Sequence, residues 1–438
     1  MKKFLTLLAF GYTMFAGAQQ FDRQKMDSLF QSIEQYNKGM GSISIHKSGD
    51  EIYQNSIGYS DVAGNRKADK DTRYRIGSIS KTFTAAMIMQ LVEEGKLDLE
   101  TKLAKFYREL PNAEKISVED LLRHQSGLFN FTSKKEYLDY MEAPRTKEEL
   151  LEIFKENGTA FSPGEKNEYS NTNYVLLSFL LEDIEKAAYP QILQKRITGP
   201  LGLENTYYGG KIDPAKGEAL SYTKKKEWEP ATETDLSIPK GAGGIVSTAS
   251  DLNEFFTALF IGKVVSASSL DEMKTMTNDY GIGLFSYPFN DKQLYGHTGG
   301  IDGFSSMAVY APEEDLAITF ISNAADMSTG DIMAGAMSIY FGNEYAIPEF
   351  SPTLDIPAEE LEKFTGTYGS ETFPLKVEIF LQDGTLMGQA TGQPSFPLEA
   401  YEENKFQFTR AGLKLEFDPE ANVMTLLQGG NAYELSRE

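Results

Sequence analysis

The stretch RIGSISKTFTAAMIMQLVEEGKL, residues 75–97, is apolar at almost every position between Phe83 and Val92. The pattern and the stop at Gly95 predict a helix, and a helix that is apolar on most of its surface has to be buried. The chain can supply the necessary core, because it has 438 residues of which 41% are hydrophobic. That length favours two or more domains.

Ser78 and Lys81 stand at the N-terminal edge of this segment, three positions apart. Residues i and i+3 lie on one face of a helix, so the hydroxyl and the amine are predicted to be neighbours. Burial and the positive end of the helix dipole both disfavour the charged ammonium. A neutral amine beside a hydroxyl can make a serine nucleophilic without histidine. The alternative is a serine-capped helix whose lysine reaches the solvent.

The Ser-x-x-Lys pattern has little specificity by itself. It occurs as Ser44 with Lys47, Ser78 with Lys81, Ser221 with Lys224, and Ser237 with Lys240. Ser44 lies in a strand pattern, where positions i and i+3 point to opposite faces, and Ser237 precedes a proline that disfavours helix. Ser221 lies in a polar stretch. The helical context is therefore found at Ser78 alone.

Two further motifs follow in order, YSN at 169–171 before a helix pattern and HTG at 297–299 before a strand pattern. With SISK at 78–81 they resemble the three motifs of the serine β-lactamase and penicillin-binding-protein superfamily. The likeness is to its class C β-lactamase-like branch, which includes D,D-carboxypeptidases, D-aminopeptidases and esterases. It extends over residues 25–345, where the phrases LLRHQSGL, GPLGLENT, GAGGIVSTASDL and YGIGLF also match.

The resemblance implies a catalytic role for three residues. Ser78 would attack a carbonyl, Lys81 would assist its deprotonation, and Tyr169 would pass the proton to and from the leaving group. The product of this step is an acyl-enzyme that water hydrolyses. Asn171 would orient Lys81 and the substrate amide.

The same resemblance implies a binding surface along the third motif. The backbone N–H groups of Ser78 and Gly300 would form the oxyanion hole, and His297, Thr298 and Gly299 would contact the substrate. Glycines suit a strand whose backbone a substrate approaches closely.

The third motif departs from the lysine that is typical of β-lactamases, because His297 occupies its place. In this respect the chain resembles carboxypeptidase-like and esterase-like members, which disfavours lactam hydrolysis as the physiological reaction. The alternative for His297 is a purely structural histidine. His124 is interpreted as structural and His46 as a solvated strand residue.

Net charge and the absence of several motifs argue against other classes of function. The 64 acidic and 42 basic residues give a formal charge of −22, which repels the phosphate backbone of nucleic acids. The sequence holds no Gly-x-Ser-x-Gly elbow, no His-Glu-x-x-His, no P-loop and no dinucleotide fingerprint. Three scattered histidines without any cysteine argue against a zinc site. No cofactor is implied.

The first 18 residues, MKKFLTLLAFGYTMFAGA, are typical of a secretory signal peptide cleaved after Ala18. Export then places the mature protein in the periplasm or outside the cell. The alternative is a membrane anchor, but the apolar stretch is shorter than the ~20 residues of a spanning helix.

The remaining chain predicts a mixed organisation. Hairpins are expected from Ser42–His46 with Glu51–Ile57 and within 303–322; helices are expected at Phe83–Glu94, Ser117–Arg123, Thr146–Glu156, Tyr174–Ala188 and Ser250–Phe260. The resemblance implies an α/β fold for 19–345, an antiparallel sheet flanked by helices plus an all-helical region. A proline-rich linker is predicted at 346–358. Residues 359–438 alternate apolar and polar positions and resemble a lipocalin-like β module.

The sequence thus predicts an exported serine hydrolase that works through an acyl-enzyme on Ser78. Its substrate would be an ester or a small peptide amide, D-amino-acid peptides included. Two alternatives stay open: a penicillin-binding-type protein that turns over slowly or not at all, and a true β-lactamase. The identity of the leaving group and the oligomeric state are not determined by the sequence.

Overall fold

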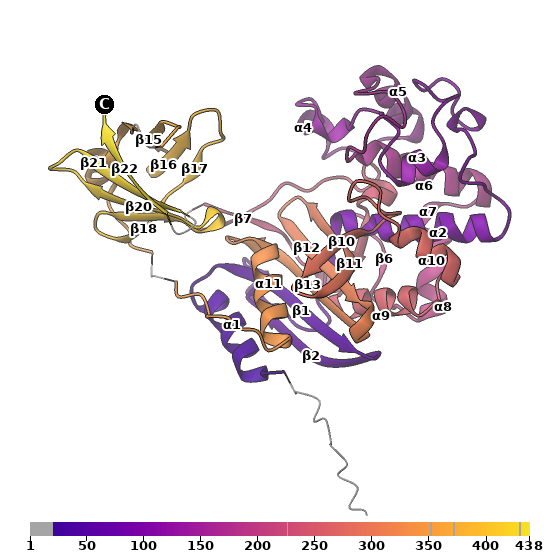
Figure 1. Ribbon diagram of the computed structural model, residues 1–438, viewed down its shortest axis with the longest axis horizontal. Helices are drawn as coiled ribbons and strands as arrows, with labels where there is room; N and C mark the ends of the chain where they lie inside the picture. The colour runs from indigo at the N-terminus through magenta and orange to yellow at the C-terminus, as the bar shows by residue number, and fades with distance from the viewer. Residues whose placement is uncertain (1–20, 226, 351–352, 371–372, 429–430) are drawn as a thin grey trace, which may run out of the picture.

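The computed structural model of the protein describes residues 21–225, 227–350, 353–370, 373–428 and 431–438. The predicted signal peptide, residues 1–18, lies outside the described residues. Two large sheets, one of six strands and one of nine, share no strand. Figure 1 shows the six-stranded sheet together with most of the helices, and the nine-stranded sheet beside them as a smaller part.

The six-stranded sheet is antiparallel, in the order β10-β11-β12-β13-β1-β2. Its strands are β1 (Gly39–Lys47), β2 (Asp50–Ile57), β10 (Phe285–Phe289), β11 (Lys292–Ile301), β12 (Phe304–Ala311) and β13 (Leu316–Ala325). Both predicted hairpins are confirmed, since β1 pairs with β2 and β12 pairs with β13. Strand β10 covers only the first half of β11, so residues 297–301 of β11 form an open sheet edge.

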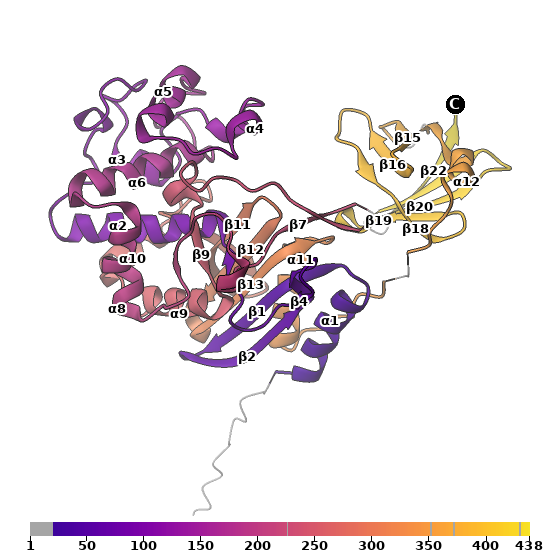
Figure 2. The same cartoon turned by 180° about the vertical axis from the view of Figure 1, so that it is seen from behind.

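Helices cover both faces of this sheet (Figure 2). On one face, α1 (Arg23–Gln35) and α11 (Thr329–Tyr340) pack against alternate strand residues such as Val309. On the other face, α9 (Ala249–Phe260) packs against the residues between them, such as Tyr310. The alternation follows from the two-residue period of a strand. The predicted α/β class is confirmed.

The helical region surrounds the apolar segment between Phe83 and Val92. That segment is α2 (Ser80–Glu93), which begins three residues before the predicted start, and most of its residues are buried. The region also contains α3 (Val118–Leu122), α4 (Tyr137–Tyr140), α5 (Lys147–Asn157), α6 (Asn171–Glu185), α7 (Tyr189–Leu193), α8 (Gly199–Leu201) and α10 (Ala267–Lys274). The capping boxes predicted for Ser117 and Thr146 are present at the starts of α3 and α5.

Short strands link these helices to the sheet. They are β3 (Tyr59–Asp61), β4 (Arg66–Lys67), β5 (Tyr74–Arg75), β6 (Tyr207–Tyr208), β7 (Tyr222–Lys224), β8 (Trp228–Pro230) and β9 (Ile245–Ser247). Strand β9 lies between β5 and β6 and therefore holds the backbone immediately before Ser78.

The nine-stranded sheet curls into a nearly closed barrel. Its strands are β14 (Gly366–Gly369), β15 (Val377–Gln382), β16 (Thr385–Ala390), β17 (Phe396–Pro397), β18 (Glu399–Glu402), β19 (Lys405–Phe408), β20 (Leu413–Asp418), β21 (Val423–Gln428) and β22 (Asn431–Arg437). The two edge strands, β17 and β18, are separated only by Leu398, so the edges meet. A short helix, α12 (Ala358–Leu361), precedes the barrel, although strands alone were expected. The predicted limits of the domains and the linker stay predictions.

A buried lysine joins the barrel to the rest of the protein. Lys38, between α1 and β1, lies 2.9 Å from a carboxylate oxygen of Asp326 and 2.6 Å from one of Glu399 on β18. Burial lowers the pKa of Lys38, but the two carboxylates outweigh this effect and the pKa is raised above its ordinary value. A cavity of about 730 Å³ adjoins this contact.

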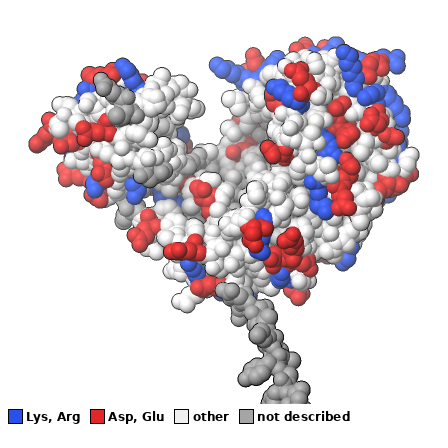
Figure 3. Space-filling view, viewed as in Figure 1, with Lys and Arg blue, Asp and Glu red and all other residues white. Residues whose placement is uncertain are grey.

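Figure 3 shows acidic side chains spread over both parts of the surface.

We expect the Lys38→Met variant to lower the free energy of unfolding by about 3 kcal/mol, because the buried Asp326 and the partly buried Glu399 both lose the Lys38 ammonium. Urea unfolding followed by circular dichroism measures the change. Lys225→Met is the matched control: Lys225 pairs with Glu229 but is 69% exposed, and we expect its loss to matter by less than about 0.5 kcal/mol. Equal effects of the two substitutions would contradict the assigned role of Lys38.

Among the described residues, none of the helices combines the length and the apolar character needed to cross a membrane.

Candidate active site

Ser78 lies in a short 3-10 turn, Gly77–Ile79, that leads directly into α2. Its side chain is partly exposed, whereas Lys81, in the first turn of α2, is completely buried. Lys81 Nζ is 2.9 Å from Ser78 Oγ. The predicted adjacency of hydroxyl and amine is therefore present, with the hydroxyl facing outward and the amine inward.

Lys81 Nζ has two further partners, both oxygen acceptors. It donates to Asn171 Oδ1 at 2.8 Å and to the carbonyl oxygen of Ala242 at 2.7 Å. Burial lowers the pKa of Lys81 well below its ordinary value. A neutral amine has two N–H groups, which the two acceptors use, and one lone pair, which is then left for the Ser78 hydroxyl.

Tyr169 is the second side chain that contacts the Ser78 hydroxyl. Its phenol donates to Ser78 Oγ at 2.7 Å, and its ring lies 4.8 Å from Lys81 Nζ. Burial raises the pKa of Tyr169 above its ordinary value, so the phenol is protonated at neutral pH. Ser78 Oγ thus lies between a buried amine and a phenolic proton donor.

Asn171 is the first residue of α6, which begins three residues before the predicted helix. Its amide nitrogen Nδ2 donates to Thr132 Oγ1 at 2.9 Å, and its backbone N–H donates to Asn130 Oδ1 at 2.9 Å. These contacts orient the Asn171 amide so that Oδ1 points at Lys81. Thr132 lies in a short 3-10 turn, Phe131–Ser133, and Asn130 precedes it; the sequence revealed no site residue there.

His297 lies on β11 near Tyr169, with ring centroids 6.4 Å apart. Its Nδ1 lies 2.5 Å from the carbonyl oxygen of Thr298 and so carries the proton. Burial is the largest cause that lowers the pKa of His297, to about 3. His297 is therefore neutral at physiological pH. Thr298 itself is exposed, beside the Tyr287 hydroxyl.

The glycines of the third motif lie against the Ser78 turn. Gly77 has φ +51°, and a Cβ placed on it would lie 2.7 Å from the backbone nitrogen of Gly300. A Cβ on Gly299 would lie 2.0 Å from the carbonyl oxygen of Ile76, whereas Gly300 faces open space. The backbones of the first and third motifs are thus in direct contact on the open edge of β11.

A buried ion pair, not predicted from the sequence, holds these two backbones together. Arg75, on β5 before the turn, is 2.9 Å from Asp302, which follows β11, and both side chains are buried. Arg75 also donates to the carbonyl oxygens of Gly210 and Thr234. The ion pair therefore links the strand that leads to Ser78 with the residue that follows β11.

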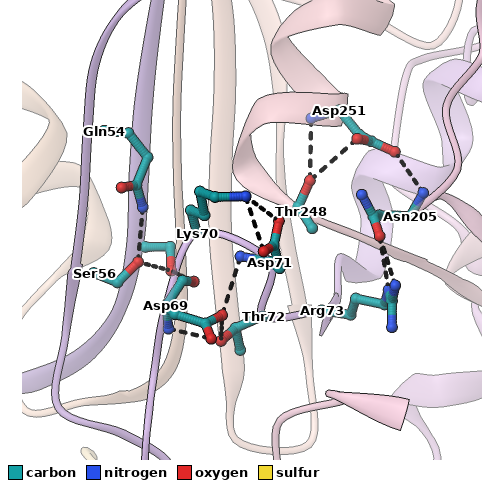
Figure 4. Close-up of polar contacts among 11 residues, drawn as sticks. Gln54, Ser56, Asp69, Lys70, Asp71, Thr72, Arg73, Asn205, Thr248 and Asp251 are labelled. Carbon is teal, nitrogen blue, oxygen red and sulfur yellow. Dashed lines mark hydrogen bonds and ion pairs between the residues drawn. The ribbon is translucent and has the colours of Figure 1, made fainter.

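A second polar network anchors the segment that enters the site (Figure 4). Arg73 donates twice to Asn205 Oδ1, at 3.0 and 2.6 Å. The backbone N–H of Asn205 donates to Asp251, whose other oxygen accepts from Thr248 at the start of α9. The network thereby connects Arg73, directly before β5, to the start of α9, which packs on the six-stranded sheet.

The histidines not assigned to the site also have defined places. His124 is buried beside Tyr169, with ring centroids 4.6 Å apart. His46 is buried as well, and its Nε2 lies 3.2 Å from Ser250 Oγ. The interpretation of His46 as a solvated residue was wrong, because α9 covers the face of β1 on which His46 lies.

Comparison with known proteins agrees with this arrangement. The family model described as Beta-lactamase matches residues 24–337. Penicillin-binding protein 4* of Bacillus subtilis is 25% identical, over 96% of this chain and 99% of the relative.

Solved structures are similar as well. A D-amino acid amidase from Ochrobactrum anthropi SV3, complexed with L-phenylalanine amide, has a TM-score of 0.65 and 26% identity, and the match covers 73% of this chain and 99% of the amidase. An octameric penicillin-binding protein homologue from Pyrococcus abyssi has a TM-score of 0.67 and 26% identity over 94% of this chain and 99% of the homologue. The predicted resemblance is confirmed: the chain belongs to the Beta-lactamase family and is a serine hydrolase.

Proposed function

We propose that the protein hydrolyses small amides and esters of D-amino acids through an acyl-enzyme on Ser78. The observation that carries the proposal is the buried Lys81 amine, 2.9 Å from Ser78 Oγ with two carbonyl-type acceptors on its other sides. That arrangement favours a neutral amine able to take the serine proton.

The reaction would proceed in two halves. Ser78 Oγ bonds to the substrate carbonyl carbon while its proton moves to Lys81 Nζ, and the negative oxygen is held by the backbone N–H groups of Ser78 and Gly300. As the C–N or C–O bond breaks, the Tyr169 phenol gives its proton to the leaving group, and the Lys81 proton restores the phenol. Water then attacks the ester, and the same groups return the proton to Ser78.

The lack of a cation on His297 in the third motif favours substrates whose leaving group carries no carboxylate. Because His297 is neutral, it provides no cation for a substrate carboxylate at the place where β-lactamases carry lysine. D-Amino-acid amides and esters lack that carboxylate, whereas penicillins and terminal D,D-dipeptides have it. The structural similarity to a D-amino acid amidase and a D-stereospecific amidohydrolase supports the same substrate class.

The test is a panel of four substrates: D-phenylalanine amide, its L-enantiomer, a D-alanyl-D-alanine peptide and a chromogenic cephalosporin. We expect the highest kcat/KM for the D-amide and at least about a tenfold preference over each of the other three, a difference of 1.4 kcal/mol in transition-state binding. Release of ammonia or D-alanine and the absorbance of the opened lactam are the readouts. Preference for the cephalosporin would favour a true β-lactamase.

The penicillin-binding alternative is supported by the similarity to penicillin-binding protein 4*. It predicts stoichiometric labelling of Ser78 by a fluorescent penicillin with no steady turnover of any substrate in the panel. Export remains part of the proposal, and mass spectrometry of the protein from the culture medium or periplasm would show whether it begins at Gln19.

A further inference from the structure

His124 contacts three consecutive residues of the segment that carries Tyr169. Its carbonyl oxygen accepts from the backbone N–H of Glu168 at 2.9 Å, and its Nδ1 accepts from the backbone N–H of Ser170 at 3.1 Å. Between these two contacts, the imidazole ring packs on the Tyr169 ring, with centroids 4.6 Å apart and 31° between the planes. One residue thus holds the backbone on either side of Tyr169 and the Tyr169 ring itself.

We propose that His124 is a positioning residue that fixes the Tyr169 phenol on Ser78 Oγ. The inference rests on the role proposed for Tyr169 in proton transfer. Residues 165–170 form no helix or strand, so regular backbone hydrogen bonds do not hold this segment. Its geometry depends on tertiary contacts, and His124 makes contacts at three consecutive residues of it.

The protonation of His124 suits this task. Its Nδ1 accepts a hydrogen bond from a backbone N–H, so the ring proton is on Nε2. Burial is the largest cause that holds the pKa of His124 well below its usual range. The ring is therefore neutral, and its acceptor persists at every pH at which the protein would work.

The backbone conformation of His124 is also unusual. It has φ +58°, a left-handed conformation that non-glycine residues seldom adopt and that Asn tolerates better than most. The conformation turns the chain after α3 so that the carbonyl and the ring of one residue both face the Tyr169 segment. Tyr174 and Tyr280 pack against the other sides of the ring, with centroids 5.2 and 5.5 Å away.

Two substitutions separate the two kinds of contact. His124→Phe keeps an aromatic ring for Tyr169 but removes the acceptor for the Ser170 N–H. His124→Asn removes the ring but keeps an acceptor, because Asn Oδ1 and His Nδ1 are equally far from Cβ, and it suits the positive φ. His46→Asn is the matched control, since His46 is equally buried but contacts Ser250 on α9.

We expect kcat for D-phenylalanine amide to fall about a hundredfold in His124→Phe, the order of loss caused by a 1 Å misplacement of a catalytic group. KM should change by less than about threefold, because His124 acts on proton transfer and not on ground-state binding. His124→Asn should recover at least about tenfold of the loss in kcat. His46→Asn should leave kcat unchanged.

A second readout does not depend on activity. With 3-fluorotyrosine incorporated at position 169, the ¹⁹F resonance reports the stacking and mobility of that ring. We expect it to shift and broaden in His124→Phe, to shift in His124→Asn because the ring is lost, and to stay in place in His46→Asn.

The two readouts separate failure of this inference from failure of the proposed function. If the wild type turns over no substrate but the ¹⁹F signal responds as expected, the function is wrong and the positioning role stands. If His124→Phe folds, keeps the wild-type kcat and leaves the ¹⁹F signal unchanged, the positioning role is overturned. If His124→Phe does not fold, His124→Asn decides: loss of the ring alone should lower kcat and broaden the ¹⁹F signal, and a wild-type kcat with a wild-type line width would overturn the positioning role.

Discussion

The Ser78→Ala variant is expected to lose at least about a thousandfold in the steady release of p-nitrophenolate from p-nitrophenyl acetate, and to show no initial burst. The reason is chemical: Ser78 supplies the oxygen that bonds to the acyl group, and neither Lys81 nor Tyr169 can replace that bond. Residual hydrolysis should come from the oxyanion hole and substrate positioning, which in other hydrolases leave a small fraction of the rate. Stopped-flow absorbance measures both the burst and the steady phase.

The chain contains its own matched control for this experiment. Ser237 belongs to another Ser-x-x-Lys pair, but its Oγ accepts from the backbone N–H of Arg145, and Lys240 pairs with Glu182. Ser237→Ala is therefore expected to keep the wild-type burst. A Ser78→Ala protein with the burst intact would show that acylation occurs at another residue.

The sequence predicted the parts of the site whose chemistry depends on side chains at short spacing. Ser78 and Lys81 were expected to be neighbours because a helical turn brings positions i and i+3 together, and the two are in contact at 2.9 Å. The start of the helix was placed three residues late, because the 3-10 turn Gly77–Ile79 carries the chain into α2 without a side-chain cap. The predicted closeness of Ser78 and Lys81 does not depend on where the helix starts, since 3-10 and α-helices both place residues i and i+3 on one side.

Other parts of the site could not be predicted from the sequence. The carbonyl oxygen of Ala242 binds Lys81, but every residue has a carbonyl, so residue type gives no signal. Arg75 and Asp302 are 227 positions apart and meet only because β5 and the end of β11 adjoin in the fold. A buried arginine just before the nucleophile could have suggested a partner carboxylate, but not which one.

Lys81→Met and Lys81→Arg test the second large effect. We expect both to lower kcat/KM by about 10²–10⁴-fold, the range typical of a lost general base. Methionine keeps the volume without a lone pair, and arginine keeps the charge but is not deprotonated in proteins. Equal losses would show that the neutral amine is what acylation requires. Substantial activity in Lys81→Arg would show instead that a positive charge beside Ser78 suffices.

The pH dependence separates a base from a structural lysine. Because burial lowers the pKa of folded Lys81 below its value of 10.5 in the unfolded chain, Lys81 is charged below the lowered pKa and neutral above it. We therefore expect kcat/KM of the wild type to rise with pH through the lowered pKa. The residual kcat/KM of Lys81→Met should not show this rise with pH.

The same pKa difference has a consequence for stability that does not require a substrate. Between the folded and the unfolded pKa of Lys81 the unfolded chain binds more protons, so the stability of the wild type relative to Lys81→Met must rise with pH across that window. This relative stability of the wild type is largest above pH 10.5, and it is lost as the pH falls through the folded pKa of Lys81. Urea unfolding of both proteins at a series of pH values measures this difference. A flat difference would mean that Lys81 keeps an ordinary pKa in the folded protein, and the proposed proton transfer from Ser78 would then have no acceptor.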